Sequence, residues 1–199
     1  RENGLDDRPI IALVAGSRGS EIRYNLPYMV AVSRRFPEYQ FVVTGVSWLD
    51  RALYDRYLQG SDVRFVCDRT YETMAQSAAA LVTSGTATLE TALLRVPEVV
   101  CFRSSAISIW VAKRLVKLRF ISLVNLVMDR EVVRELIQED FVPERAEVEL
   151  RAVLPGGEKH ERMVRDFAEL REAMGEPGAS VRVATEMVRL LNEKRGNTK

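Results

Sequence analysis

The stretch that decides the fold is Ile10-Ile11-Ala12-Leu13-Val14-Ala15-Gly16-Ser17-Arg18-Gly19-Ser20-Glu21. Its first part, residues 10–15, is an apolar run of the length of a buried strand. A turn of small residues follows and leads into a segment with helical spacing at 21–35. A buried strand joined to a helix by a glycine turn is typical of α/β proteins with a parallel sheet.

The same alternation continues along the chain. Further runs rich in β-branched residues predict strands at 39–44, 63–67, 80–83 and 98–102, and helical spacing predicts helices at 48–58, 71–78, 86–95 and 105–118. Such alternation implies parallel strands with right-handed crossovers, so we expect a Rossmann-like doubly wound α/β sheet. In the common strand order 3-2-1-4-5-6, a ligand binds at the carboxyl ends of the first and fourth strands.

The last third of the chain predicts extra C-terminal helices. A short sixth strand is expected at 121–123, and from residue 130 onward the pattern is helical only, with helices at 131–138, 144–154, 158–174 and 179–193. The breaker Gly175-Glu176-Pro177-Gly178 separates the last helix from the others. We therefore divide the chain into a linker remnant at 1–8, a Rossmann-like domain at 9–175 and a C-terminal helix and tail at 176–199.

The composition limits the function classes. A chain of 199 residues that is 47% hydrophobic can bury the core of one domain. Lys and Arg number 29 and Asp and Glu 28, so no net positive field points to nucleic acid. No apolar run approaches the roughly 20 residues that span a bilayer, and the N-terminus lacks the features of a signal peptide, which predicts a cytoplasmic protein.

The sequence predicts neither a metal site nor a disulfide bond. Cys67 and Cys101 each lie in an apolar run, which predicts packed free thiols in a reducing compartment. His160 is the only histidine and the acidic residues show no ligand spacing, so no metal site is expected. We expect His160 on a helix surface rather than as a catalytic base.

The turn after the first strand contains Gly16, Ser17, Arg18 and Gly19. The glycines let the backbone approach a ligand, and the following helix offers free N–H groups to an anion. Arg18 adds a guanidinium that suits a diphosphate. An ordinary turn with a solvated arginine is the alternative. The stretch lacks both the Gly-Lys-Ser/Thr end of a Walker loop and the G-x-G-x-x-G pattern, which disfavours a hydride-transferring dinucleotide enzyme.

A second glycine turn follows the fourth strand as Ser84-Gly85-Thr86. Ser84 or Thr86 can cap the next helix, and the amides of its first turn can hold phosphate oxygens. Glu90 lies four residues past Thr86 on the same helix face, so its carboxylate can bind sugar hydroxyls. The alternatives are plain capping for Ser84 and Thr86, and an acid that complements the helix dipole for Glu90.

Several motifs, in order and spacing, resemble the lipid-A-disaccharide synthase family over nearly the whole chain. They are Gly16-Ser17-Arg18 with Glu21, Ser84-Gly85-Thr86-Ala87-Thr88-Leu89-Glu90, Val99-Val100-Cys101-Phe102-Arg103, Ala112-Lys113-Arg114-Leu115-Val116-Lys117, Ile121-Ser122-Leu123-Val124-Asn125-Leu126 and Glu135-Leu136-Ile137-Gln138. The chain departs from the commonest pattern by Ala15 and Val124 in place of proline and by Phe102 in place of tyrosine.

The resemblance implies the C-terminal half of a GT-B glycosyltransferase. Such an enzyme joins UDP-2,3-diacylglucosamine to 2,3-diacylglucosamine 1-phosphate, forming a β-1,6 disaccharide and UDP, with no metal cofactor. The residues that it assigns to UDP are Gly16, Ser17, Arg18, Ser84, Gly85, Thr86 and Glu90, and Arg18, Asn125 and Gln138 are its expected catalytic set, the last two lining the donor side of the cleft. The acceptor and the catalytic carboxylate belong to the N-terminal domain, towards which the tail at 176–199 is expected to pack.

The predicted helix at 105–118 is basic and amphipathic, with Lys113 and Lys117 beside an apolar arc. It either packs on the sheet as a crossover helix or lies on the inner face of the inner membrane of a Gram-negative bacterium. The sequence leaves open whether the protein forms a homodimer. The rival functions are another GT-B UDP-sugar enzyme, namely the peptidoglycan glycosyltransferase of lipid II synthesis or a UDP-sugar 2-epimerase, and a nucleotide-sensing module without chemistry. The Ser122-Leu123-Val124-Asn125 stretch followed by Gln138 disfavours both rival enzymes.

Overall fold

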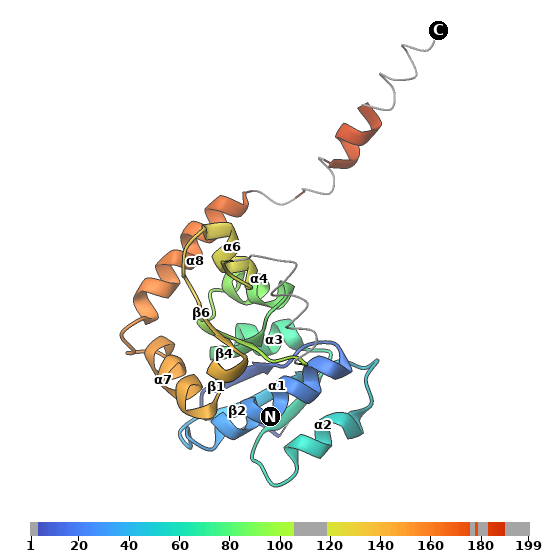
Figure 1. The fold of residues 1–199 in the computed structure, drawn as a ribbon, viewed down its shortest axis with the longest axis vertical. Coiled ribbons are helices and arrows are strands. Elements are labelled where there is room, and N and C mark those ends of the chain that lie inside the picture. The colour runs from blue at the N-terminus through green and yellow to red at the C-terminus, as the bar shows by residue number, and fades with distance from the viewer. Residues whose placement is uncertain (1–3, 106–118, 176–177, 179–182, 190–199) are drawn as a thin grey trace.

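A single parallel sheet of six strands forms the centre of the protein (Figure 1). The structure, a computed structural model, describes residues 4–105, 119–175, 178 and 183–189. The strands are β1 Ile10–Val14, β2 Gln40–Gly45, β3 Arg64–Cys67, β4 Ser77–Thr83, β5 Glu98–Phe102 and β6 Arg134–Ile137. Their order is β3-β2-β1-β4-β5-β6, which confirms the predicted Rossmann-like doubly wound sheet and places β1 beside β4.

Helices cover both faces of this sheet. Those that the structure describes with assigned bounds are α1 Gly19–Ser33, α2 Arg51–Leu58, α3 Thr70–Ala75, α4 Thr86–Leu93, α6 Leu123–Met128, α7 Pro143–Val153 and α8 His160–Met174, together with the 3-10 turn η1 Gln138–Asp140. Along β1, Ile11 and Leu13 join the core cluster that includes residues of α1, α2, α7 and α8. Ala12 and Val14 point to the other face, where they pack with Met74 of α3.

The segment from 121 to 138 corrects two predictions. No strand forms at 121–123, because the Ser122 hydroxyl accepts a hydrogen bond from the Asn125 backbone and caps α6, which begins at Leu123. The helix expected at 131–138 contains β6, which pairs with β5. The apolar spacing of Val132, Val133 and Leu136 suits a helix as well as a strand, and the free edge of β5 decides between them.

Other boundaries differ by a few residues from the expected ones. The helix predicted at 71–78 ends at Ala75, and β4 already begins at Ser77. The predicted helix at 105–118 lies outside the described residues except for Ser105. Within the predicted helix at 179–193, residues 183–189 are helical, and the remainder is also outside the described part of the chain.

The two cysteines are free thiols in different surroundings. Cys101 on β5 is buried as predicted, and desolvation raises the pKa of its thiol well above the usual value. Cys67 is exposed, which corrects the prediction that it is packed. Because β3 is an edge strand, the end of this strand has a neighbour on one side only.

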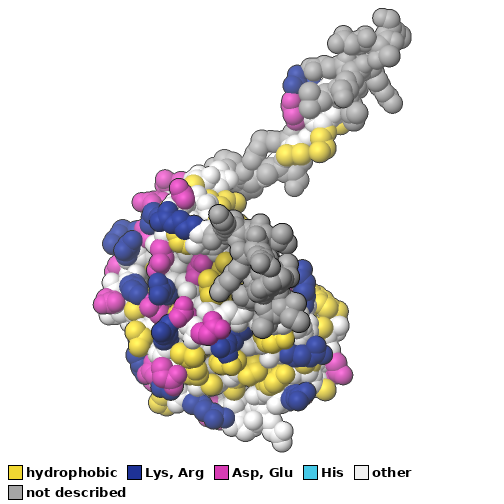
Figure 2. Space-filling model, in the orientation of Figure 1, with side chains coloured by type: hydrophobic (Ala, Val, Ile, Leu, Met, Phe, Trp, Pro, Cys, Tyr) yellow, Lys and Arg dark blue, Asp and Glu magenta, His cyan; other side chains and the backbone are white. Residues whose placement is uncertain are grey.

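An ion pair joins α7 to the segment that follows α1, beside a second pair within α7. The Glu147 carboxylate lies 2.9 Å from the Arg35 guanidinium and 3.1 Å from that of Arg151. The hydrogen bonds from Arg35 and then Arg151 lower the pKa of Glu147. Charges of both signs are interspersed over the face drawn in Figure 2, in keeping with the net charge of +1. On this face, positively and negatively charged side chains therefore lie near one another.

Candidate nucleotide-sugar site

A cavity of about 470 Å³ opens at the carboxyl ends of β1, β2 and β4. It is lined by Val14, Gly16, Ser17, Arg18, Glu21, Thr44, Val46, Thr70, Tyr71, Thr83, Ser84, Gly85, Thr86, Ala87 and Glu90. The structure thus brings together every residue that the sequence assigned to nucleotide binding. Its volume falls within the range of about 300–1,000 Å³ that is usual for ligand pockets.

The first glycine turn depends on Gly16. This residue has a φ of +108°, and a Cβ there would collide with the Glu21 side chain. The Glu21 carboxylate accepts hydrogen bonds from the backbone N–H groups of Ser17, at 2.9 Å, and Arg18, at 3.2 Å. It also pairs with the Arg18 guanidinium at 3.0 Å. Glu21 therefore holds both the backbone of the turn and the arginine that emerges from it.

Glu21 had no assigned role in the sequence analysis, although it was quoted in the motif. A signal was available, because a glutamate three residues after the N-cap residue, here Arg18, can accept a hydrogen bond from the N-cap backbone N–H, which is one half of a capping box. The arginine side chain has no acceptor, so the other half does not form. Arg18 itself is 79% exposed and can reach a bound anion.

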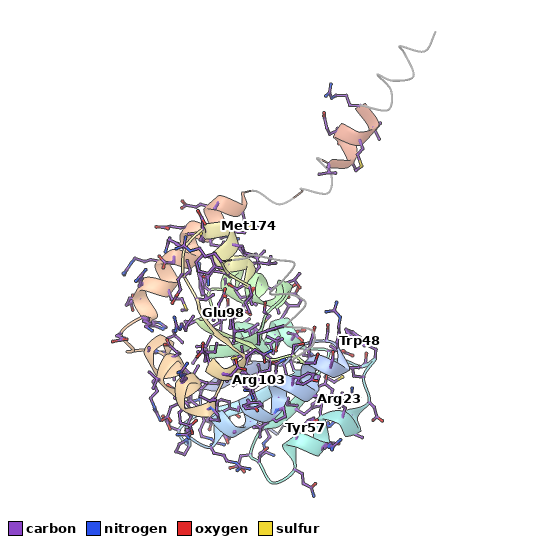
Figure 3. All side chains as sticks on the ribbon, in the orientation of Figure 1. Arg23, Trp48, Tyr57, Glu98, Arg103 and Met174 are labelled. Carbon is purple, nitrogen blue, oxygen red and sulfur yellow. The ribbon has the colours of Figure 1, made fainter. Side chains whose placement is uncertain are left out.

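Trp48 is a second residue that the sequence analysis missed. Its indole N–H donates a hydrogen bond to the Ser17 carbonyl at 3.1 Å, although the residue is 69% exposed. Figure 3 shows Trp48 at the edge of the body. This contact fastens the first turn to the segment after β2.

The second glycine turn presents open backbone to the cavity. A Cβ at Gly85 would meet nothing within 4 Å, so this glycine leaves room rather than relieving a clash. The first-turn amides of α4, including those of Thr86 and Ala87, lie beyond the reach of intrahelical acceptors. They carry the partial positive charge of the helix N-terminus and face the same cavity as Arg18.

The hydroxyl groups of the second turn divide into two kinds. Ser84 donates its hydroxyl hydrogen to the Ile121 carbonyl at 2.8 Å, and Thr88 donates to the Gly85 carbonyl at 2.9 Å. Thr83 is 4% exposed and lines the cavity, and its Oγ1 has no partner within the described part of the chain. Thr83 is thus a buried donor available to a ligand, which the sequence analysis treated only as the end of a strand.

Glu90 and Tyr71 form the far wall of the cavity. Glu90 is half-buried on α4, and Tyr71 is exposed on α3. Desolvation raises the pKa of Tyr71, and the nearby negative charge of Glu90 raises it further. The phenol hydroxyl therefore stays protonated beside a carboxylate, and the two side chains together offer hydrogen-bond donors and acceptors to a polar ligand.

Asn125 does not line this cavity. It is fully buried, and its side-chain N–H groups donate to the Val133 carbonyl at 2.8 Å and to Glu135 at 2.9 Å. Its side-chain oxygen accepts from the backbone N–H groups of Val132 and Val133. The hydrogen-bonding capacity of this amide is used inside the protein, so direct contact with a ligand is absent in this conformation.

Gln138 also lies away from the cavity. Its backbone is left-handed, with a φ of 53°, and its side chain donates to the Ser104 carbonyl at 3.2 Å. Its own carbonyl accepts from the Arg103 side chain at 3.0 Å, and Arg103 stacks on Tyr28 at 3.9 Å. In the structure, Gln138 holds the segment that follows β5 through its bonds to Arg103, which Figure 3 labels, and to Ser104.

The described part of the chain shows neither a metal-binding cluster nor a membrane-spanning helix. Its residues contain no group of three or more His, Cys, Asp or Glu side chains arranged to hold a metal ion. None of the helices described is both long and apolar enough to cross a membrane. His160 begins α8 and is half-buried, and its Nδ1 lies 2.8 Å from the Val153 carbonyl. It therefore has a local structural contact far from the cavity lining.

Comparison with protein families gives a match over most of the chain. The family model for lipid-A-disaccharide synthetase matches residues 2–184. The lipid-A-disaccharide synthase of Anaeromyxobacter dehalogenans (strain 2CP-C) is 41% identical over 191 residues, and that of Pseudomonas fluorescens (strain Pf0-1) is 32% identical over 200 residues. These matches cover 92% and 98% of this chain but 50% and 52% of the relatives, so the chain spans about half their length.

Solved structures share the fold at low sequence identity. The calicheamicin glycosyltransferase CalG4 matches with a TM-score of 0.61 and 15% identity, over 96% of this chain and 45% of that protein. The UDP-GlcNAc 2-epimerase of Neisseria meningitidis, solved with UDP-GlcNAc, matches with a TM-score of 0.57 and 14% identity, over 93% and 46%. The fold observed here thus corresponds to one half of each of these larger proteins.

Proposed function

The chain belongs to the lipid-A-disaccharide synthase family, and we propose that it binds the UDP-sugar donor of a glycosyl transfer. The proposed donor is UDP-2,3-diacylglucosamine and the proposed acceptor is 2,3-diacylglucosamine 1-phosphate, with a β-1,6-linked lipid A disaccharide and UDP as products. The observation that carries the proposal is the cavity in which two glycine turns meet. Each turn leads into a helix, α1 or α4, and residues of both turns line the same cavity.

The diphosphate fits between the two turns. The amides at the start of α4, the Thr83 hydroxyl and the Arg18 guanidinium supply hydrogen bonds and positive charge around the cavity. These groups suit an anion because helix N-termini and guanidinium groups both favour negative charge. Two such turns, one after β1 and one after β4, restrict the orientation of a bound diphosphate more than a single turn would.

The chemical role of these groups follows from the charge of the leaving group. When a sugar is transferred from UDP, negative charge develops on the departing β-phosphate. Amides and a guanidinium already held in place stabilise this charge more strongly in the transition state than in the ground state. Glu21 contributes by keeping Arg18 in position. We assign Glu90 to the ribose hydroxyls, because carboxylate oxygens accept hydrogen bonds from a neighbouring diol.

The remaining parts of the reaction are proposed to lie in the half of the relatives that this chain does not cover. These are the acceptor pocket and the catalytic carboxylate. A location on the cytoplasmic side of the inner membrane, contact with that membrane and a homodimer belong to the same proposal, since the lipid substrates are membrane components.

Calorimetric titration of this chain with UDP, uridine and NAD tests the proposal. We expect UDP to bind more tightly than uridine, because the diphosphate adds the contacts of both turns, and NAD to bind weakly or not at all. Tighter binding of NAD than of UDP, or no heat from UDP at millimolar concentration, would refute the assignment of the cavity to a UDP-sugar. A nucleotide-sensing module would also bind UDP, so activity of the longer protein separates it from the enzyme.

A further inference from the structure

The Glu135 carboxylate on β6 gathers the hydrogen-bond donors at the start of α6. It accepts from the backbone N–H groups of Ile121 and Ser122, each at 2.9 Å, and from the Ser122 hydroxyl at 2.8 Å. The Asn125 side chain donates to it at 2.9 Å. Hydrogen bonds to a charged acceptor are stronger than those between neutral groups, so this carboxylate fixes the position of the segment.

The peptide group between Ile121 and Ser122 is bound on both sides. Its N–H donates to Glu135, and its C=O accepts the hydroxyl hydrogen of Ser84 at 2.8 Å. Because a peptide group is planar and rigid, the position of one side determines that of the other. An acceptor on the N–H side also polarises the group, which strengthens the bond at the carbonyl.

Ser84 connects this peptide group to the second glycine turn. Its backbone N–H donates to the Cys101 carbonyl at 3.3 Å, and its hydroxyl hydrogen goes to Ile121. Neither hydrogen is free for a phosphate oxygen. The neighbouring Gly85 and Thr86 are exposed, and a Cβ at Gly85 would touch nothing. The Ser84 hydroxyl bond is therefore one of the contacts that orient the turn, beside the Ser84 N–H bond to Cys101 and the bonds that the Gly85 carbonyl accepts from Thr88.

We propose that Glu135 is a positioning residue for the donor site, acting through the Ile121–Ser122 peptide group and Ser84 on the amides of the second turn. The inference rests on the proposed function, in which those amides bind the diphosphate. It gives Ser84 a role different from the direct phosphate contact expected from its sequence position.

We call the connection from Glu135 through the Ile121–Ser122 peptide group and Ser84 to the second turn the relay. Amide NMR spectra of the chain without ligand test it. Glu135→Gln keeps the size of the side chain but turns an N–H group towards donors, so it disturbs the peptide group. We expect it to shift the amide resonances of Gly85, Thr86 and Ala87. In a Ser84→Ala background, Glu135→Gln should leave the resonances of Gly85, Thr86 and Ala87 unchanged, because the hydrogen bond from Ser84 to the Ile121 carbonyl is already missing. The matched control is Glu139→Gln, at an exposed carboxylate nearby.

If Glu135→Gln does not fold, the relay can be tested in the opposite direction, by changing Ser84 and observing the peptide group that it contacts. Ser84→Ala alone should shift the amide resonances of Ile121 and Ser122, because it removes the donor to their shared peptide group. Unmoved resonances at these two positions would overturn the inference, as would equal shifts from Glu135→Gln with and without Ser84.

Titration with UDP gives the functional readout. Glu135→Gln and Ser84→Ala should each weaken UDP binding about tenfold, the effect of one hydrogen bond of ordinary strength. The double variant should be no weaker than either single one, and Ser84→Thr, which keeps the hydroxyl, should restore binding. If the affinity of the double variant for UDP fell by the product of the two single losses, the inference would be overturned. Failure of the unsubstituted chain to bind UDP would refute the proposed function instead, and the NMR spectra would still decide whether the relay exists.

Discussion

Arg18 and Glu90 both line the cavity, and their opposite charges predict different effects on ligands. Arg18→Ala should weaken UDP about ten- to a hundredfold and leave uridine unchanged, because it removes a hydrogen bond to a charged phosphate. Glu90→Ala should weaken UDP and uridine alike, because both carry the ribose. Calorimetry with both ligands measures the difference.

Surface residues of the same type provide the controls for this pair. Arg56 on α2 and Glu72 on α3 are exposed and do not line the cavity. Their alanine variants should bind both ligands as the unsubstituted chain does. Equal losses for Arg18→Ala and Glu90→Ala on both ligands would contradict the separate assignments to the diphosphate and the ribose.

Gly16 and Gly85 provide a second matched pair, because each begins a turn but for a different reason. Gly16→Ala should lower the free energy of unfolding by about 1–3 kcal/mol, since it strains a left-handed backbone and strikes Glu21. Gly85→Ala should leave stability within about 0.5 kcal/mol but weaken UDP at least tenfold, since its methyl group enters the open space beside the amides. Urea unfolding and UDP titration of both variants separate the two effects.

Glu98 at the start of β5, labelled in Figure 3, is fully buried, and neither carboxyl oxygen has a partner among the described residues. Desolvation raises its pKa well above the ordinary value of 4.5. In the unfolded chain the group ionises above pH 4.5, whereas in the fold it ionises only at a higher pH. The unfolded state therefore gains free energy as the pH rises, and stability declines from about pH 4.5 upward until the folded pKa is reached.

Glu98→Leu should raise the free energy of unfolding at pH 7 by about 1–3 kcal/mol, the usual cost of a buried polar group without a partner. The gain should be smaller at pH 4, where the carboxyl is protonated in both states. Glu98→Gln should flatten the pH dependence without the full gain. Urea denaturation at both pH values checks this, and the same gain at pH 4 and pH 7 would show that ionisation of Glu98 does not contribute.

At the scale of single residues, the sequence predicted residues of the cavity because they lie just after strands. Ser17, Arg18 and Thr86 line it for that reason, and Glu90 lies about one helical turn past Thr86 on α4. Asn125 entered only through the family resemblance, and spacing along the chain could not show that its amide is used by backbone groups of another loop. Residue contacts of that kind depend on the three-dimensional path of the chain.

The elements of the sheet were predictable to the extent that each carried an apolar run of its own. The first five strands have such runs, and their positions were confirmed to within a few residues. β6 could not be recognised, because Arg134-Glu135-Leu136-Ile137 has little intrinsic strand character. Its pairing with β5, far away in sequence, supplies the missing stabilisation.

The connection between α6 and β6 depends on Asn125, so we predict a large structural effect there. Asn125→Ala removes the acceptor for the buried N–H groups of Val132 and Val133. Leaving buried donors unsatisfied costs about 1–3 kcal/mol each, so the free energy of unfolding should fall by about 2–4 kcal/mol. Chemical denaturation measures it. A loss below about 0.5 kcal/mol would show that the connection is held by other contacts.

At the scale of the whole molecule, the proposed function gives the chain one wall of a two-walled site. The cavity at the carboxyl ends of β1 and β4 supplies the proposed donor contacts, and the chain corresponds to about half the length of its relatives. Glycosyl transfer also requires an acceptor held within reacting distance and a carboxylate to activate it, and the rate depends strongly on that alignment. Binding and transfer should therefore be separable properties.

We predict that this chain by itself binds UDP but does not transfer a sugar. Incubation with UDP-2,3-diacylglucosamine and 2,3-diacylglucosamine 1-phosphate should release no UDP above the uncatalysed rate, whereas a protein of the relatives' full length should. Adding the other half as a separate chain should restore little activity, since contacts between domains are usually modest and the linker raises their effective concentration. Turnover by this chain at a rate near that of the full-length protein would show that the donor half contains the whole reaction site.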